Sequence, residues 1–266
     1  MNRLKDKKLF LLDLDGTLYV SEKLIGKTLD FLDAVVENGG KYMFLTNNSS
    51  KSVATYIPRL NAIGIKAAED NFFTSAQATA YYIEKKYGKN KRAYVVGTDS
   101  FKKSLLDEGF NITDQLEDGI ELLVVGFDTE LTYKKLEEAC ILIHRGVDYI
   151  ATNPDLACPS QFGFIPDCGA ITACIEAATG KKPHYAGKPD PTMIYMASEK
   201  AGIPLDKACM IGDRLYTDIA IGNNAGVLSV AVLTGGTTRE EIANSEGNLV
   251  PDLVCDSIDD IYEAIK

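Results

Sequence analysis

The most restrictive feature of this chain is a series of short, continuous apolar runs separated by stretches with helical spacing. The first run is Leu9-Phe10-Leu11-Leu12, and the next is Tyr42-Met43-Phe44-Leu45. Between them, apolar residues recur at helical spacing, and Gly39-Gly40 ends the predicted helix; these residues are Leu29, Leu32, Val35 and Val36. Strands that are apolar on both sides are typical of a parallel sheet covered on both faces. The segment therefore predicts a β-α-β unit.

The same alternation continues along the chain. Further apolar runs occupy residues 93–96, 122–125, 147–151, 209–211 and 227–233, with helical patterns between most of them. This order predicts an α/β protein with an open parallel sheet. Gly180-Lys181-Lys182-Pro183 marks a junction between domains, because Gly and Pro interrupt regular structure there.

Polar residues follow three of the predicted strands at the point where each strand ends. These residues are Asp13, Thr46 and Asp213. In open parallel sheets, ligands bind beyond the carboxyl ends of the strands. We therefore expect the three side chains to converge on one site.

Asp13 and Asp15 form a carboxylate pair directly after the first predicted strand. Alternate residues of an extended segment point the same way, and the Gly16-Thr17 turn can direct both carboxylates into one site. Two neighbouring carboxylates repel each other unless a cation or a proton lies between them, so the pair indicates a metal. The alternative is a solvated turn, since Asp and Gly are common turn residues.

Composition restricts the partners of the chain. The net charge of −10 over 266 residues gives no broad basic surface for nucleic acid or an anionic membrane. No apolar run approaches the ~20 residues of a membrane span. The apolar run after the charged N-terminus is interrupted by Asp13 and Asp15, which argues against a targeting segment. The six cysteines contain no CxxC pair, so we expect reduced thiols in a cytoplasmic protein rather than a zinc site.

Four motifs in order carry a resemblance to a known family. Leu12-Asp13-Leu14-Asp15-Gly16-Thr17-Leu18-Tyr19 resembles the first motif of the haloacid dehalogenase (HAD) superfamily. The segments Thr46-Asn47-Asn48, Gly187-Lys188-Pro189 and 212–218, which contains Asp213 and Asp218, resemble the other three. Taken alone, the Thr-Asn cluster is typical of a loop or helix cap, and a lone Lys of a solvated surface. Ala151-Thr152-Asn153-Pro154-Asp155 is similar to the NagD-like, p-nitrophenylphosphatase branch, and the resemblance covers essentially the whole chain.

The resemblance implies a split architecture. The expected fold is a Rossmann-like, doubly wound parallel-sheet core with an inserted α/β cap domain. The core would comprise residues 1–78 and 182–266, and the cap residues 79–181, a length adequate for a hydrophobic core of its own. The oligomeric state is not readable from the sequence, although caps in this branch often form dimer surfaces, which makes a homodimer through the cap one candidate arrangement.

The resemblance also implies a magnesium-dependent phosphatase that acts on a small phosphorylated metabolite. Asp13 would be the nucleophile and Asp15 the general acid and then base. The Asp13 side chain, the Asp15 backbone carbonyl and the Asp213 side chain would hold Mg²⁺, with Asp218 in support. The remaining phosphate and substrate contacts are assigned to Thr46, Lys188, Gly16, Asn47 and Asn48 in the core motifs, and to Asn153, Asp155, Cys158 and the loop from Gly163 to Gly169 in the cap.

Several alternatives stay open. Asp15 and Asp213 disfavour dehalogenation, because dehalogenating members resemble a version without the second Asp and the metal, and ion pumps of this chemistry need membrane spans. A phosphotransferase or mutase would use the same residues, and a non-catalytic binding protein would have lost some of them. The substrate can be a sugar phosphate, a nucleoside monophosphate, phosphoglycolate or pyridoxal phosphate. His144 and His184 receive no catalytic role.

Overall fold

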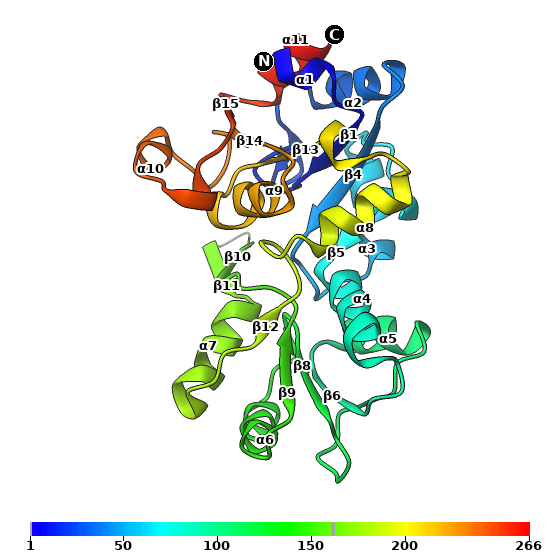
Figure 1. The fold of residues 1–266 in the computed structure, drawn as a ribbon, viewed down its shortest axis with the longest axis vertical. Helices are drawn as coiled ribbons and strands as arrows, with labels where there is room; N and C mark the ends of the chain where they lie inside the picture. Colours follow the sequence, from blue (N-terminus) through cyan, green and yellow to red (C-terminus); the bar gives the residue numbers. More distant parts are fainter. Residues whose placement is uncertain (1, 161–162) are drawn as a thin grey trace. The chain divides into compact units, whose positions relative to one another are not determined.

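A computed structural model describes residues 2–160 and 163–266 (Figure 1). The chain forms two compact units. Unit 1 contains the residues up to Thr46, Ala54–Phe73 and the chain from Lys188 onward. Unit 2 contains Asn47–Val53 and Thr74–Gly187. Each unit has a parallel sheet flanked by helices, so the predicted α/β fold class is confirmed.

The sheet of unit 1 has the strand order β15-β14-β13-β1-β4-β5. Its strands are β1 (Leu9–Leu12), β4 (Lys41–Thr46), β5 (Phe72–Thr74), β13 (Ala208–Gly212), β14 (Leu228–Val232) and β15 (Leu253–Cys255). Strands β13 and β4 flank β1 in parallel register, which sets Leu12 beside Ile211 on one side and Phe44 on the other. Every residue of β1, β13 and β14 is buried, as the continuous apolar runs predict.

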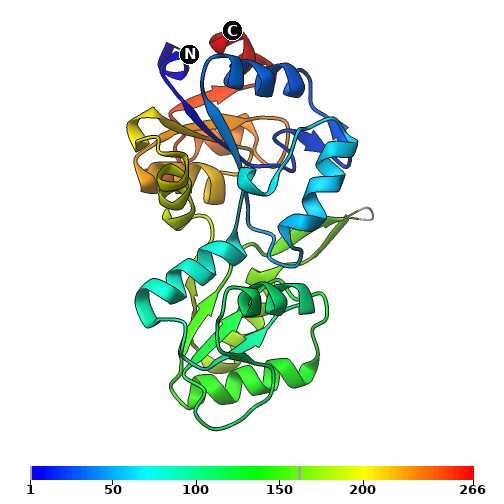
Figure 2. The same ribbon diagram turned by 90° about the vertical axis from the view of Figure 1, so that its right-hand side faces the viewer.

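Helices cover both faces of this sheet (Figure 2). On one face lie α2 (Thr28–Glu37) and α3 (Val53–Ala62), and on the other α8 (Thr192–Ala201) and α9 (Ala220–Ala225). The chain runs outward from β1 in one direction and from β13 in the other, so right-handed crossovers place their helices on opposite faces. The junction of β1 and β13 is therefore the switch point where such sheets bind ligands.

The predicted apolar face of α2 is only partly correct. Leu32 and Val35 are buried, whereas Leu29 and Val36 are exposed. Phe31 supplies the missing contact, because it is fully buried and packs edge-to-face on Phe10 of β1 with ring centroids 5.7 Å apart.

Shorter elements complete unit 1: α1 (Asn2–Lys5), β2 (Tyr19–Val20), β3 (Lys23–Leu24), η1 (Glu69–Asn71), η2 (Leu205–Lys207), the π-helical turn η3 (Leu215–Ile219), α10 (Arg239–Ala243), η4 (Gly247–Leu249) and α11 (Ile258–Ile265).

The sheet of unit 2 has the order β12-β9-β8-β6-β7. Alternate residues of its central strands face two separate cores: Tyr94 and Leu123 pack with α6 and α7, and Val95 and Val124 pack with α4 and α5. The elements are α4 (Ser75–Tyr87), β6 (Ala93–Val96), α5 (Asp99–Asp107), β7 (Ile112–Thr113), β8 (Leu122–Val125), α6 (Tyr133–His144), β9 (Asp148–Ala151), α7 (Cys168–Thr179) and β12 (His184–Tyr185).

Unit 2 is larger than residues 79–181. It also contains residues 47–53, 74–78 and 182–187. Residues 47–53 directly follow β4 but hydrogen-bond within unit 2: the Ser49 hydroxyl lies 2.9 Å from the Thr152 hydroxyl and accepts the Phe127 N–H. The expected junction at Gly180–Pro183 lies inside unit 2, because His184 and Tyr185 pair with β9.

One expectation about the cap is wrong. The segment from Gly163 to Gly169 is not a loop, because β11 (Gly163–Pro166) pairs antiparallel with β10 (Ala157–Ser160) and α7 begins at Cys168. The Asp167 side chain caps that helix by accepting the Cys168 N–H at 2.5 Å. Pairing with β10 and this cap give the segment regular structure.

Two findings bear on the environment of the protein. Across the described residues, none of the helices combines the length and apolar character needed to cross a bilayer. All six cysteines are free thiols.

Candidate active site

The centre of the candidate site is a pair of aspartates on neighbouring strands of unit 1. Asp13 follows β1 and donates its backbone N–H to the Ile211 carbonyl of β13 at 3.0 Å. Asp213 follows β13 directly. The two strands are parallel neighbours, so their carboxyl ends bring both side chains to the switch point of the sheet.

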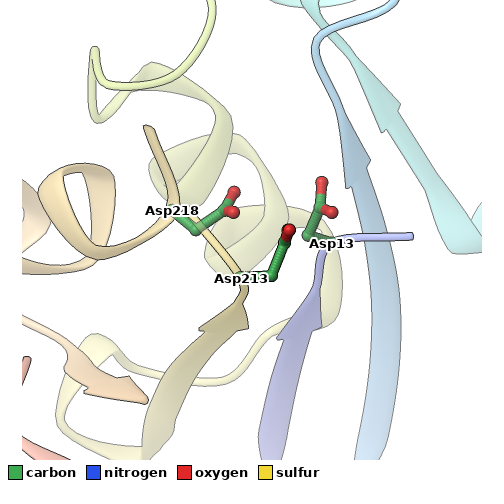
Figure 3. A group of neighbouring side chains, drawn as sticks. All are labelled: Asp13, Asp213 and Asp218. Atoms are coloured by element: carbon green, nitrogen blue, oxygen red, sulfur yellow. The ribbon is translucent and has the colours of Figure 1, made fainter. Parts of the chain in front are cut away.

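Asp218 completes a cluster of three carboxylates (Figure 3). Oxygen atoms of Asp13, Asp213 and Asp218 all lie within 4.8 Å of one another. Asp218 is carried by the π-helical turn η3, and such turns are frequent at functional sites. Its side chain lies against Gly212, where an added Cβ would come within 2.3 Å of the Asp218 Cβ, and the Arg214 N–H donates to its Oδ2 at 3.1 Å.

Lys188 supplies a buried cation to this cluster. Its side chain is 3% exposed. The Nζ atom donates to Asp13 Oδ1 and Asp218 Oδ1, both at 2.6 Å, and to the Leu45 carbonyl at 3.2 Å. A buried ammonium group is stable only when it is paired in this way. The structure thus brings together four of the residues that the sequence motifs predicted.

Burial and mutual repulsion dominate the electrostatics of the cluster. Burial raises the pKa of Asp13 well above its usual range, Lys188 opposes that rise, and the other two carboxylates add to it. Burial, followed by the Asp218 charge, raises the pKa of Asp213 to about 6. Burial alone would lower the pKa of Lys188, but Asp13 and Asp218 outweigh it and the pKa is raised. One ammonium group therefore faces three carboxylates that repel one another.

The residues present fit a divalent cation. Asp213 Oδ2 accepts the Gly236 N–H at 2.5 Å, whereas Asp213 Oδ1 is buried and has no hydrogen-bond partner among the described residues. A buried carboxylate oxygen without a partner is costly unless a cation binds it. The donor set consists of oxygen atoms alone, which suits a hard ion such as Mg²⁺.

Asp15 and Gly16 form the turn next to this cluster. Asp15 is exposed, and its Oδ2 accepts a hydrogen bond from the Tyr19 hydroxyl at 3.4 Å. Gly16 has φ +91°, a conformation that favours glycine, and a Cβ at this position would lie 2.6 Å from Asp213 Oδ2. The motif therefore needs glycine both for its backbone angle and for the close approach of Asp213.

Thr46 is the last residue of β4 and is buried. Its neighbour Leu45 provides the carbonyl that binds Lys188. The contact of Thr46 with a phosphoryl group stays a prediction.

The predicted substrate residues of unit 2 bind one another. Asn47 Nδ2 donates to Asp155 Oδ2 at 2.9 Å, and Asn153 Nδ2 donates to the Asn47 carbonyl at 2.7 Å. Asn153 Oδ1 accepts the Asp155 N–H at 2.9 Å, and all three side chains are buried. Asn48 Nδ2 lies 4.0 Å from Cys158 Sγ on β10. These bonds give the residues a role in the structure of unit 2, and their contact with a substrate stays a prediction.

Sequence reasoning missed the segment after β14. The Thr234 hydroxyl donates to the Gly16 carbonyl at 2.6 Å, and the Gly236 N–H holds Asp213. Gly235 lies so close to Asp213 that an added Cβ would be 2.0 Å from Oδ2. The sequence did contain a signal that this segment belongs to the site. Thr234-Gly235-Gly236 follows an apolar run, just as Asp13, Thr46 and Asp213 do.

Two models of known protein families match this chain, and both describe hydrolases of the haloacid dehalogenase type. A family model described as haloacid dehalogenase-like hydrolase matches residues 10–111, and a HAD-hydrolase-like model matches residues 185–261. An acid sugar phosphatase of Staphylococcus epidermidis is 34% identical over 243 residues, covering 91% of this chain and 93% of the relative. A 5'-nucleotidase of Bacillus subtilis is 33% identical over 241 residues, with coverage of 91% and 93%.

Solved structures agree with this placement. The 4-nitrophenylphosphatase of Thermotoga maritima is 40% identical, with a TM-score of 0.92 and 99% coverage of both chains. A glycerol phosphate phosphatase of Mycobacterium tuberculosis, solved in complex with magnesium, is 27% identical, with a TM-score of 0.90 and coverage of 98% of this chain and 78% of that chain. The predicted family and enzyme class, a HAD-type phosphatase, are thereby confirmed. A solved structure described as a putative nagD protein is 39% identical, with a TM-score of 0.88 and coverage of 97% of this chain and 98% of that chain. The chain belongs to the haloacid dehalogenase-like hydrolases, in the NagD-like branch that contains the p-nitrophenylphosphatases.

Proposed function

We propose that this protein hydrolyses phosphate monoesters of small molecules in a Mg²⁺-dependent reaction that passes through an aspartyl-phosphate. The observation that carries the proposal is the cluster of three carboxylates in unit 1, at the carboxyl ends of β1 and β13, two of which bind the buried Lys188. Uncatalysed hydrolysis of phosphate monoesters is extremely slow, so a large reduction of the barrier is required.

Asp13 is the nucleophile. Its carboxylate forms a bond to phosphorus while the bond from phosphorus to the leaving oxygen breaks, which divides one difficult step into two easier ones. Asp15 gives a proton to that leaving oxygen. Asp15 then takes a proton from the water that attacks phosphorus and releases inorganic phosphate from Asp13.

Positive charge and hydrogen bonds stabilise the phosphoryl group during both steps. Lys188 is fixed by Asp13 and Asp218 and offsets negative charge that develops beside it. Thr46, Gly16, Asn47 and Asn48 are the remaining candidates for phosphate contacts. Mg²⁺, held by Asp13, Asp213, Asp218 and the Asp15 carbonyl, would neutralise phosphoryl charge when bound. The magnesium complex of the mycobacterial relative supports this choice of ion.

The names of the relatives support a class of substrate for this protein. Their names include acid sugar phosphatase, 5'-nucleotidase, glycerol phosphate phosphatase and 4-nitrophenylphosphatase. We infer that this protein acts on sugar phosphates, nucleoside monophosphates or similar small esters. A panel of such esters compared by kcat/KM would identify the preferred one.

The two units have separate roles in this proposal. Unit 1 carries Asp13, Lys188, Asp213 and Asp218 and is the catalytic core. Unit 2 is the inserted cap, which selects the leaving group through residues such as Asn153, Asp155 and Cys158 and forms a homodimer surface. A cytoplasmic location fits the free cysteines. Size-exclusion chromatography with light scattering tests the dimer.

The decisive experiment measures products released from p-nitrophenyl phosphate. Activity should require Mg²⁺, disappear with EDTA and disappear in Asp13→Asn. The matched control is Asp33→Asn, which changes an exposed aspartate of unit 1 that pairs with Lys66 on the surface. Retention of the wild-type rate by Asp13→Asn would refute the proposal. Nitrophenol released in excess of inorganic phosphate when an alcohol is added would instead identify a phosphotransferase.

A further inference from the structure

Tyr19 is a buried side chain whose hydroxyl lies beside Asp15. Tyr19 has no exposed surface, whereas Asp15 is exposed. The Tyr19 hydroxyl donates to Asp15 Oδ2 at 3.4 Å. A phenylalanine would fill the same space in the core, so packing explains the ring but not the hydroxyl. The direction of the hydroxyl toward a proposed acid/base residue needs a functional reason.

The local backbone fixes this pair. Leu18 donates its N–H to the Leu14 carbonyl at 3.0 Å, which forms a single helical turn after the strand. The Gly16 N–H then donates to the Tyr19 carbonyl at 2.9 Å, and Tyr19 begins the short hairpin in which it pairs with Leu24. This turn returns Tyr19 to the side of Asp15, four residues earlier in the chain.

The geometry holds the Tyr19 hydroxyl toward Asp15, and an ordinary tyrosine hydroxyl, with a pKa of about 10, keeps its proton at neutral pH. The Arg59 guanidinium of α3 lies over the Tyr19 ring, 5.2 Å from its centroid, and helps to hold the ring in place. The phenol is therefore a protonated donor with little freedom to turn away.

We propose that Tyr19 is a positioning residue for Asp15. By donating to Oδ2, its hydroxyl fixes the rotation of the carboxyl group and assigns the transferable proton to Oδ1. This inference rests on the proposed function. In the first step, the proton moves from Asp15 to the leaving oxygen as the ester bond to phosphorus breaks and the bond from Asp13 to phosphorus forms. A carboxyl group held on a rigid partner delivers that proton without first having to be oriented.

Two aryl esters of similar shape separate this role from a structural one. p-Nitrophenolate leaves readily without a proton, whereas phenolate is a poorer leaving group and depends on the acid. The quantity kcat/KM covers only the steps up to departure of the alcohol, so it reports on leaving-group protonation. General acid catalysis contributes about 10²–10⁴-fold in total. We expect Tyr19→Phe to lower kcat/KM for phenyl phosphate by about tenfold, a part of that total, and to leave p-nitrophenyl phosphate within about twofold of the wild type.

The matched control is Tyr42→Phe. Tyr42 also belongs to unit 1, and its hydroxyl donates to the Lys66 carbonyl at 3.0 Å rather than to an acid of the site. This variant should leave the ratio of the two kcat/KM values unchanged. The ratio is measured on one preparation, so it does not depend on the fraction of folded enzyme.

The outcomes are distinct. A selective loss for phenyl phosphate in Tyr19→Phe supports the positioning role. An equal loss for both esters, or no loss, overturns it and leaves a structural role for Tyr19. Failure of the proposed function is recognised separately, because the wild type would then hydrolyse neither ester in a Mg²⁺-dependent reaction abolished by Asp13→Asn.

Discussion

Gly235→Ala provides a stringent test of how the metal site is built. A Cβ at position 235 would lie 2.0 Å from Asp213 Oδ2 and 2.6 Å from its Cγ. Because real contacts of a Cβ essentially never fall below 3.0 Å, the carboxylate must retreat by about 1 Å. That movement would break the hydrogen bond from the Gly236 N–H and turn Asp213 away from Asp13 and Asp218.

The variant is expected to lose much of its affinity for Mg²⁺. Loss of a hydrogen-bonding partner that orients a metal ligand typically costs about 10–100-fold in metal affinity. A displacement of about 1 Å at a reacting group can cost about 100-fold in rate. We therefore expect Gly235→Ala to need about 10–100 times more Mg²⁺ for half-maximal hydrolysis of p-nitrophenyl phosphate. The assay is a Mg²⁺ titration at saturating substrate, with urea unfolding as the check of stability.

Gly236→Ala is the matched control. A Cβ at this neighbouring position would lie 3.3 Å from Asp213 Oδ2, so a small adjustment accommodates it and the N–H donor is kept. Its Mg²⁺ requirement should rise by less than about tenfold, the lower end of the range expected for Gly235→Ala. Equal Mg²⁺ requirements for Gly235→Ala and the wild type, or equal losses in both variants, would refute the role assigned to this loop.

Three further predictions concern the ion, the core and unit 2. Mg²⁺ at about 100 times its dissociation constant should stabilise the wild type by about 2.7 kcal/mol in thermal unfolding, and Asp213→Asn should abolish the shift; a shift that survives would place the ion elsewhere. Phe31→Ala should lower the free energy of unfolding in urea by about 3–5 kcal/mol, because it removes a fully buried ring that packs on Phe10. Asn153→Ala should lower the melting temperature, since it removes one of two donors to the buried Asn47 carbonyl, which keeps the Ser75 hydroxyl at 2.6 Å; the loss of one such bond costs about 0.5–1.5 kcal/mol. A rise in KM without loss of stability would instead support contact of Asn153 with the substrate.

The sequence was most informative where function depends on local pattern. Asp13, Thr46 and Asp213 were predicted at strand ends, because an apolar run followed by a polar residue is visible in the chain itself. Parallel strands share one carboxyl edge, so the convergence of these residues follows from the alternation of strands and helices along the chain. Lys188 was assigned to the site from its flanking Gly and Pro and from its place in the order of the family motifs, since a lone lysine is normally a solvated surface residue.

The sequence was least informative where a residue acts through a partner distant in the chain. Gly235 matters only because β14 lies beside β13, which brings its loop against Asp213. Asn153 was predicted to contact substrate, but whether an asparagine faces a ligand or a backbone carbonyl depends on packing within unit 2. The segment 163–169 shows the same limit, because it was predicted to be a loop whereas pairing with β10 makes much of it a strand.

The excess of negative charge in the cluster implies that substrate and cation bind together. The three carboxylates of Asp13, Asp213 and Asp218 outnumber the cations that act on them, Lys188 and Arg214, so a phosphate dianion that arrived alone would meet net repulsion in a buried site. A divalent cation reverses that balance, and reciprocity then requires phosphate to strengthen binding of the cation. Inorganic phosphate should therefore raise the melting temperature only when Mg²⁺ is present. An equal shift in EDTA would show that Lys188 alone is sufficient to hold the anion.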